Sequence, residues 1–245
     1  MEFSEGLEKI DFNAFTDTSI ECVDLPSSTR RIGAEAFMDC KRLRDVQLNE
    51  GLETLGEAER PGRWRYRGNV FLASALKSVV IPSTLEVLEE RTFSACKKLS
   101  SVAFAEGSRL REIGDACFGK TGLKVFEAPP SLRKIGSGAF CFCKNLQRVV
   151  LNEGLEIVGT DNKKSRYENG AFECSDIKEL VIPGTLVNLS ENSFRDCIFL
   201  ERVWVEQRCQ INIANYVRSR VDVRVFRTGD KIFLSSIRSS AGNGK

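Results

Sequence analysis

The sequence predicts a solenoid in which one short parallel strand recurs in every coil, and three observations support this fold class. A phenylalanine recurs at intervals of 22 to 25 residues, apart from two longer gaps. Two aliphatic residues precede most of these phenylalanines, at minus eight and minus five, and an apolar-x-x-apolar-x-apolar stretch follows each of them. Repetition at such a period indicates stacked structural units rather than one closed globule.

The recurring phenylalanines mark eight coils. They are separated by 22, 34, 22, 25, 22, 32 and 22 residues, so two of the gaps contain insertions. The anchors are Phe15, Phe37, Phe71, Phe93, Phe118, Phe140, Phe172 and Phe194. A longer period lies over the short one, because "LNEGLETLG" at 48–56 returns as "LNEGLEIVG" at 151–159, each just before an insertion. We infer that a block of four coils was duplicated.

The stretch after each anchor predicts the strand. In Leu146-Val149-Leu151, for example, the last two apolar positions alternate, as a short strand with one buried face requires. One unit has no second layer on which to bury that face, so the units must stack. Strands about 4.8 Å apart would make eight coils a rod or arc roughly 35 to 40 Å long.

The wording of the repeat resembles a known family. The stretch "IGSGAFCFCKNLQRVVLNEGLEIVG" at 135–159 follows the pattern I-G-x-x-A-F-x-x-C-x-x-L-x-x-V-x-I-P of BspA-like leucine-rich repeats, and the resemblance extends over about residues 7 to 226. It implies an α/β solenoid with a curved sheet of short parallel strands and short helical turns on the other side. Members are mostly bacterial and protist surface proteins implicated in adhesion. This chain departs from them in its two insertions, its few Ile-Pro dipeptides and the lack of a visible export signal.

We expect one solenoid domain over 1–226, with insertions at about 57–69 and 160–169. Within it, 207–226 is predicted to be a capping segment, in which the alternation of Val221, Val223 and Val225 indicates a closing strand. The Ser- and Arg-containing segment 227–245 is expected to be a flexible tail.

Nine cysteines raise the question of disulfides or a metal site. Three residues after each anchor, cysteine alternates with a hydroxyl residue from coil to coil. The row reads Thr18, Cys40, Ser74, Cys96, Thr121, Cys143, Ser175 and Cys197. Cysteines two coils apart would lie near 10 Å from one another, beyond the reach of a disulfide. We therefore expect reduced thiols and hydroxyls that hydrogen-bond backbone carbonyls. Cys141-Phe142-Cys143 lacks a second ligand pair, so no zinc site is predicted, and Cys22, Cys117, Cys174 and Cys209 receive no role.

Composition narrows the function classes. The chain contains no histidine, the commonest catalytic base and metal ligand, and its net charge is only +2. No apolar run approaches the length of a membrane span, and no signal peptide is visible after Met1. The sequence contains no catalytic constellation or phosphate loop, although a carboxylate-based enzyme is not excluded. We expect a monomeric, non-enzymatic binding protein without cofactor or metal.

Two regions are candidate partner sites. The first is on the outer sheet face, where Val150, Val181 and Trp204 should be neighbours flanked by Arg148 and Arg202, the composition of a binding hot spot. The alternative is that 207–226 folds back over Trp204. The second region is a pair of basic, aromatic insertions, expected on one edge roughly 20 Å apart. Their residues are Arg63, Trp64, Arg65, Tyr66 and Arg67 in the first and Lys163, Lys164, Arg166 and Tyr167 in the second. The alternative here is two solvated loops.

The predicted function is binding of a protein, or a glycan, through the outer sheet face and these loops. Three outer rows of the sheet carry six basic and six acidic residues, so a nucleic-acid groove is not expected there. Two settings remain open. Reduced cysteines and the missing signal favour an intracellular scaffold, whereas the family resemblance favours a cell-surface adhesion protein.

Overall fold

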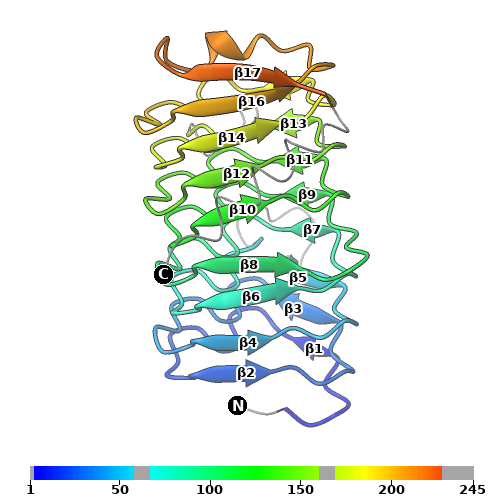
Figure 1. Ribbon diagram of the computed structural model, residues 1–245. Helices are drawn as coiled ribbons and strands as arrows, with labels where there is room; N and C mark the ends of the chain where they lie inside the picture. Colours follow the sequence, from blue (N-terminus) through cyan, green and yellow to red (C-terminus); the bar gives the residue numbers. More distant parts are fainter. Residues whose placement is uncertain (1–2, 58–66, 160–168, 228–245) are drawn as a thin grey trace, which may run out of the picture.

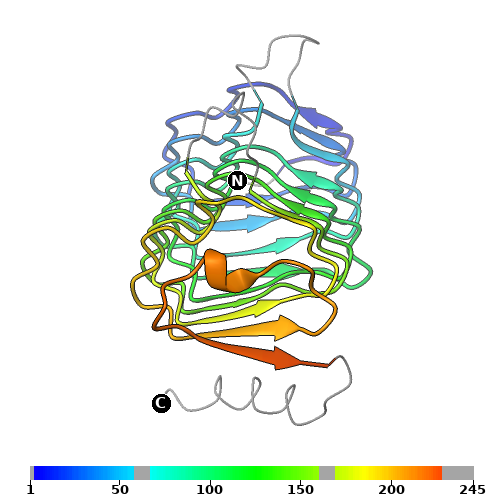
Figure 2. The ribbon, with the colours of Figure 1, turned by 90° about the horizontal axis from the view of Figure 1, so that it is seen from above.

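The protein is a β-solenoid of stacked coils, seen from the side in Figure 1 and along its axis in Figure 2. The computed structural model describes residues 3–57, 67–159 and 169–227. Within these residues each coil consists of a short rear strand, a turn that contains the anchor phenylalanine, and a front strand. Eight such coils and a final strand build the stack.

The front strands follow the predicted apolar-x-apolar stretches. All pair in parallel with the next coil where they are hydrogen-bonded. They are β2 Cys22–Asp24, β4 Asp45–Gln47, β6 Ser78–Ile81, β8 Ser101–Phe104, β10 Val125–Glu127, β12 Arg148–Val150, β14 Glu179–Ile182, β16 Arg202–Glu206 and β17 Asp222–Phe226. Hydrogen bonding is continuous from β10 to β17, whereas β2–β4 and β6–β8 form separate pairs.

A second row of strands contains the second residue of each aliphatic pair, as β7 contains Leu88 but not Leu85. These rear strands are also parallel, in the orders β1-β3-β5 and β15-β13-β11-β9-β7. Their bounds are β1 Lys9–Ile10, β3 Arg31–Gly33, β5 Thr54–Glu57, β7 Val87–Leu88, β9 Glu112–Ile113, β11 Lys134–Ile135, β13 Ile157–Val158 and β15 Asn188–Leu189. The coils therefore contribute two strands each rather than one.

One continuous core fills the interior of the coils. The predicted inward positions of both strand rows are mostly buried, and six of the eight anchor phenylalanines are fully buried. The partly exposed inward positions are Leu7, Ile20, Leu48, Val102 and Phe104. The anchor rings stack along the axis, with neighbouring centroids 5.2–5.7 Å apart and ring planes 7–14° from parallel.

The predicted helical turns are not found. Among the described residues the only helical element is the 3-10 turn η2, Ile213–Asn215. In the anchor turns of coils 1 to 6 a residue two positions before the phenylalanine, and another two positions after it, adopts a positive φ; in the fourth coil these are Arg91 and Ala95. In coils 7 and 8 only the second of these positions does. A left-handed residue interrupts a right-handed helix. The turn instead donates N–H groups to the next coil, as from Phe93 to the Cys117 carbonyl at 2.9 Å.

The C-terminal segment closes the stack by extending the front sheet. After β16 the chain passes through η2 and returns as β17, which pairs with β16 from Arg202↔Asp222 to Glu206↔Phe226. The alternation of Val223 and Val225 therefore marks a strand, as predicted. No further coil of the described residues follows β17, and Val225 is 69% exposed.

Two edges bound the front sheet. The turns that run into the front strands form the leading edge, at the left of Figure 1, and the loops that leave them form the trailing edge. Most of the charged side chains considered below lie on the front face or on these edges.

Candidate functional site

The outer face of the front sheet carries the predicted partner residues in register. Glu127, Val150, Val181, Trp204 and Arg224 lie side by side on β10, β12, β14, β16 and β17. Their strands form the continuous half of the sheet. The sequence order of the row therefore becomes a contiguous stripe, with Arg224 added at its end by the closing strand.

The stripe is less open than its counterpart in the first half of the solenoid. Val80 on β6 is 56% exposed, whereas Val150 and Trp204 are half-buried and Val181 is 7% exposed. The Arg224 guanidinium carbon lies 5.2 Å from the centre of the Trp204 ring, within the range of a cation–π contact. Segment 207–226 thus reaches Trp204 from the neighbouring strand.

Charged side chains border the stripe in the adjacent row. Arg148, Glu179, Arg202 and Asp222 are in register on β12, β14, β16 and β17. Arg202 Nη2 lies 2.8 Å from Glu179 Oε1, and Arg148 is buried. The two arginines expected to flank the apolar stripe do so, one of them in an ion pair.

The two insertions leave the coil at the same point, directly after the rear strands β5 and β13. At the first, Gly68 N donates to Gly56 O at 2.8 Å, which brings the two stem ends together. Gly68 has φ +74°, and a Cβ there would lie 1.8 Å from the Glu90 carbonyl oxygen. A larger residue does not fit at this position.

Only one of the nine predicted loop residues is described. Arg67 Nη1 lies 3.7 Å from Glu89 Oε1 at the base of the first insertion. Burial raises the pKa of the Glu89 carboxyl, an effect that the Arg67 charge opposes. The other eight residues lie outside the described residues; they are Arg63, Trp64, Arg65, Tyr66, Lys163, Lys164, Arg166 and Tyr167.

The alternating cysteine row makes the predicted hydrogen bonds. Cys96 Sγ lies 3.2 Å from Ser74 Oγ and donates to the Phe71 carbonyl at 3.0 Å. The same arrangement recurs for Cys40, Cys143 and Cys197. All nine cysteines are free thiols.

Within the described part of the chain, one group of side chains has the spacing of metal ligands. Atoms of Glu173, Cys174 and Asp196 lie within 4.8 Å of one another. However, Glu173 Oε1 is 2.5 Å from Arg195 Nη2, and Glu173 Oε2 accepts a hydrogen bond from Gly170 N at 2.8 Å. Each oxygen of the Glu173 carboxylate therefore already contacts a donor of the protein, and Glu173 forms an ion pair with Arg195.

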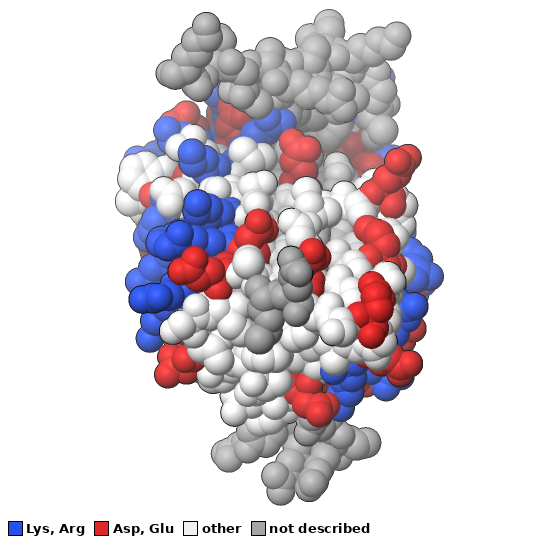
Figure 3. All heavy atoms as spheres, turned by 90° about the horizontal axis from the view of Figure 1, so that it is seen from below, with Lys and Arg blue, Asp and Glu red and all other residues white. Residues whose placement is uncertain are grey.

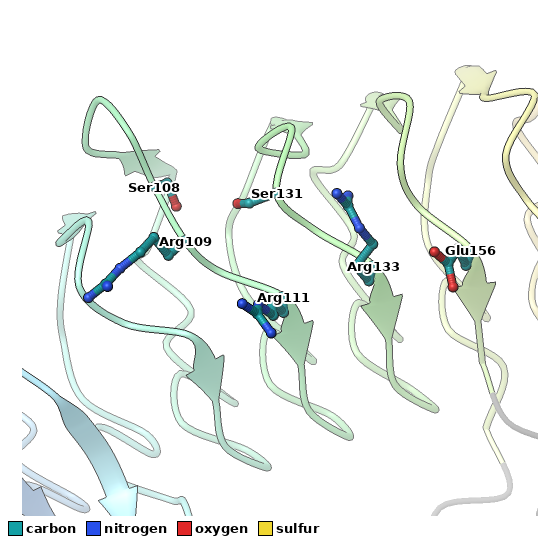
Figure 4. A pocket seen from close by; sticks show the side chains of 6 residues that line it. All are labelled: Ser108, Arg109, Arg111, Ser131, Arg133 and Glu156. Atoms are coloured by element: carbon teal, nitrogen blue, oxygen red, sulfur yellow. The ribbon is translucent and has the colours of Figure 1, made fainter.

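A pocket of about 470 Å³ opens on the trailing edge, between three successive loops (Figure 4). Its lining residues are Ser108, Arg109, Arg111, Ser131, Arg133 and Glu156. Arg133 Nη1 donates to the carbonyls of Pro130 and Leu132 at 3.0 and 3.2 Å, which stabilises its loop. The Arg133 guanidinium therefore already makes hydrogen bonds within its own loop. Glu156 adds a negative charge to the pocket.

Three rows of residues were predicted to lie on the outer face of the front sheet, but the strands begin after the first of these rows. The row Glu21, Arg44, Lys77, Ser100, Lys124, Gln147, Lys178 and Glu201 directly precedes the front strands and lies on the leading edge, outside the sheet. Viewed along the axis from the N-terminal end, Lys and Arg side chains gather on that side of the molecule (Figure 3). A count of charged residues in each turn, instead of on the strand face, would have revealed the positive charge of this edge from the sequence.

Two stacked parallel sheets, a phenylalanine ladder and an alternating thiol row define a leucine-rich-repeat solenoid. The chain belongs to the BspA-type leucine-rich repeat family, whose model matches residues 1–59, 67–201 and 158–227 in six copies. No curated protein sequence matches it. Among the described residues, no helix has the length and apolar character needed to cross a membrane.

Comparison with solved structures finds bacterial leucine-rich repeat proteins. A protein from Bacteroides ovatus has 19% identity and a TM-score of 0.52, over 89% of this chain and 64% of its own. A cell surface protein from Faecalibacterium prausnitzii has 17% identity and a TM-score of 0.42, over 93% and 65%. The Treponema pallidum leucine-rich repeat protein has 21% identity and a TM-score of 0.41, over 99% and 81%. The chain therefore spans less than two thirds of the length of the Bacteroides and Faecalibacterium proteins.

Proposed function

We propose that the chain is a non-catalytic binding module that holds a protein, or a glycan, on the outer face of its front sheet. The observation that carries this proposal is the in-register stripe of Val150, Val181 and Trp204 on three hydrogen-bonded strands. An aromatic residue among aliphatic side chains, with Arg202 and Arg224 beside it, is the composition of an interface hot spot. The insertions, which leave the coils at equivalent points, are proposed to add contacts from a neighbouring side.

Rigidity supports this role. The face is built on a core in which successive coils are joined by two strand rows and a turn ladder. Little conformational entropy should be lost when a partner binds such a preorganised surface.

The test compares two truncations on the same row of the front sheet. We expect Trp204→Ala to weaken binding of a captured partner by about tenfold or more, as hot-spot truncations do. Val80→Ala, at the exposed equivalent position in the first half of the sheet, should leave binding unchanged. Affinity capture with wild type and both variants, followed by titration of the recovered partner, measures the difference. Equal binding by all three proteins would show that the stripe is not the binding surface.

Family membership supports adhesion at a cell surface as a second candidate, against an intracellular scaffold. Labelling of intact source cells with a membrane-impermeant reagent separates the two. Recovery of the labelled chain supports adhesion, and its protection until the cells are lysed supports the scaffold.

A further inference from the structure

The leading edge of coils 2 to 6 has a strong excess of positive charge. Residues 39–44, 73–77, 95–100, 120–124 and 142–147 contain nine basic residues and one acidic residue, Asp39. The nine, all exposed and here named the basic ridge, are Lys41, Arg42, Arg44, Lys77, Lys97, Lys98, Lys120, Lys124 and Lys144. Backbone hydrogen bonds run along the edge, as from Lys77 N to Arg44 O at 3.3 Å. Four coil steps separate its ends, so at about 4.8 Å per step the ridge is roughly 20 Å long.

The protein itself neutralises little of this charge. Among the described residues, the ion pairs of the ridge are Lys41–Asp39 at 4.0 Å and Lys144–Asp176 at 3.5 Å, one at each end. Beyond coil 6 the excess of positive charge ends. Coil 7 keeps Lys178 before its front strand but has Asp176 in the same turn. Coil 8 has exposed Ile198 and Phe199 in the turn positions that Lys97 and Lys98 occupy in coil 4. The ridge is therefore a bounded strip of cations held close together at some electrostatic cost, which an anionic ligand would relieve.

One turn position of the ridge is cationic with a period of two coils. In coils 2, 4 and 6 a lysine directly follows the row cysteine, as Lys97 follows Cys96. In coils 3 and 5 the turn is one residue shorter, and Ala75 and Gly122 follow the row residue instead. The alternation of cysteine with serine or threonine inside the coil is thus accompanied outside it by a lysine in every second coil.

The other ridge cations do not follow this period. Lys77 and Lys124 stand directly before their front strands, as Arg44 does in coil 2, and Lys120 precedes the row threonine of coil 5.

We propose that the basic ridge binds a linear acidic polysaccharide with a disaccharide repeat, carrying sulfate or carboxylate groups. Such a chain alternates two sugars, and hence two placements of its anionic groups, along one axis. The ridge likewise has a two-coil period along its own axis, in the lysines that directly follow the row residue, Lys41, Lys97 and Lys144. Lysine exceeds arginine by seven to two in the ridge. Lysine ammonium groups act as hydrated point charges that suit sulfate and carboxylate groups without planar recognition.

The same features disfavour other polyanions. Single-stranded nucleic acid needs aromatic platforms for its bases. The only aromatic side chain in the ridge ranges is Phe142, and Lys120 Nζ lies 5.7 Å from the centre of its ring. An extended acidic peptide repeats its side chains on one face roughly every 6.6 to 6.8 Å. That period loses register with coil steps of about 4.8 Å after a few residues.

The experiment compares two variants with the same change in net charge. The ridge variant is Lys97→Gln, Lys98→Gln and Lys124→Gln. The control is Arg31→Gln, Arg109→Gln and Arg111→Gln, which removes three exposed cations from the rear sheet and the trailing edge. All six residues are exposed, so melting curves should coincide with that of the wild type. The probe is a short heparin fragment, titrated by calorimetry at several salt concentrations.

We expect the wild type and the control to bind the fragment within about twofold of each other. The ridge variant should bind about tenfold or more weakly, with a shallower salt dependence because fewer counterions are released. Equal losses in both variants would indicate attraction to net charge alone and would overturn the proposal, as would no binding by the wild type.

Two further probes test the class of ligand. Polygalacturonate has the same charge on every sugar and should bind more weakly than heparin at equal concentrations of charge. Single-stranded DNA of matched charge should also bind more weakly. If the DNA bound more tightly than heparin, the ligand of the ridge would be a nucleic acid and the polysaccharide proposal would be wrong. If polygalacturonate bound as tightly as heparin, the match between the disaccharide repeat and the two-coil period of the ridge would be refuted. None of these outcomes depends on the Trp204 stripe, so this proposal and the proposed function can fail separately.

Discussion

At the scale of single residues, the thiol and hydroxyl row supplies hydrogen-bond donors to the backbone carbonyls of the anchor phenylalanines. The Phe118 carbonyl accepts from Thr121 Oγ1 at 2.8 Å within its own coil and from Cys143 Sγ at 3.1 Å in the next coil. The carbonyl of a buried residue is thereby satisfied by small side chains that fit between coils. Larger polar residues would not fit there, and apolar ones would leave the carbonyl with fewer partners.

These buried thiols predict a loss of stability in alkali. Burial raises the pKa of the Cys96, Cys143 and Cys197 thiols from 9.0 to about 11. The unfolded thiol therefore loses its proton at lower pH than the folded one. The free energy of unfolding should be at its full value below pH 9 and should fall as the pH rises to about 11, by up to about 1.4 kcal/mol per pH unit for each thiol.

Cys96→Ser removes one of these titrating groups while keeping a side chain that the row already uses. Denaturant unfolding across this pH window should therefore show a shallower decline for Cys96→Ser than for the wild type. Parallel pH profiles for the two proteins would contradict the assignment.

At the scale of the element, the anchor turn replaces the helix of the expected repeat. Its two left-handed residues are rarely glycine, so each turn stores strain. Ala95, for example, has φ 58° and donates its N–H to the Gly119 carbonyl at 2.8 Å. Hydrogen bonds between coils stabilise the turn, since most of the positive-φ residues in coils 1 to 7 donate their N–H groups to the next coil.

A β-branched residue at such a position should be costly. We expect Ala95→Val to lower the free energy of unfolding by about 1–2 kcal/mol, because the left-handed conformation brings Cβ close to the backbone. Ala103→Val is the matched control, since Ala103 is exposed on the front strand β8, where β-branched residues are favoured. Urea denaturation measures both, and equal effects of the two substitutions would show that the turn geometry does not matter.

At the scale of the whole molecule, stability is carried by contacts between neighbouring coils. Each inner anchor ring stacks on two others, as Phe93 does on Phe71 and Phe118 at 5.5 and 5.3 Å. In the first coil, Phe15 is only partly buried. A solenoid of this kind is a nearly one-dimensional array, in which a central defect weakens two interfaces.

Truncation of the ladder should therefore depend on position along the axis. We expect Phe93→Ala to lower the free energy of unfolding by about 3–5 kcal/mol. The same change at Phe15 should cost clearly less, because Phe15 contributes less buried surface. Equilibrium unfolding followed by circular dichroism checks this, and equal losses at the two positions would argue against nearest-neighbour stabilisation.

Sequence reasoning predicted the residue order of the candidate site better than its surroundings. Val150, Val181 and Trp204 are consecutive neighbours because a parallel stack transfers the repeat register directly into space. Their burial, and the contact of Arg224 with Trp204, depend on where the chain goes after the last repeat. No periodic pattern specifies that path.

The sequence by itself determined the coils, the inward residues and the thiol row, because these follow from periodicity, and a periodic chain must stack its apolar positions to bury them. Only the tertiary structure decided that the second side of each coil is a strand and a left-handed turn instead of a helix. The sign of φ at residues such as Arg91 and Ala95 is imposed by hydrogen bonds to the next coil and not by their side chains. It also decided where the sheet face ends and its edge begins, and hence that the cations of coils 2 to 6 form one ridge.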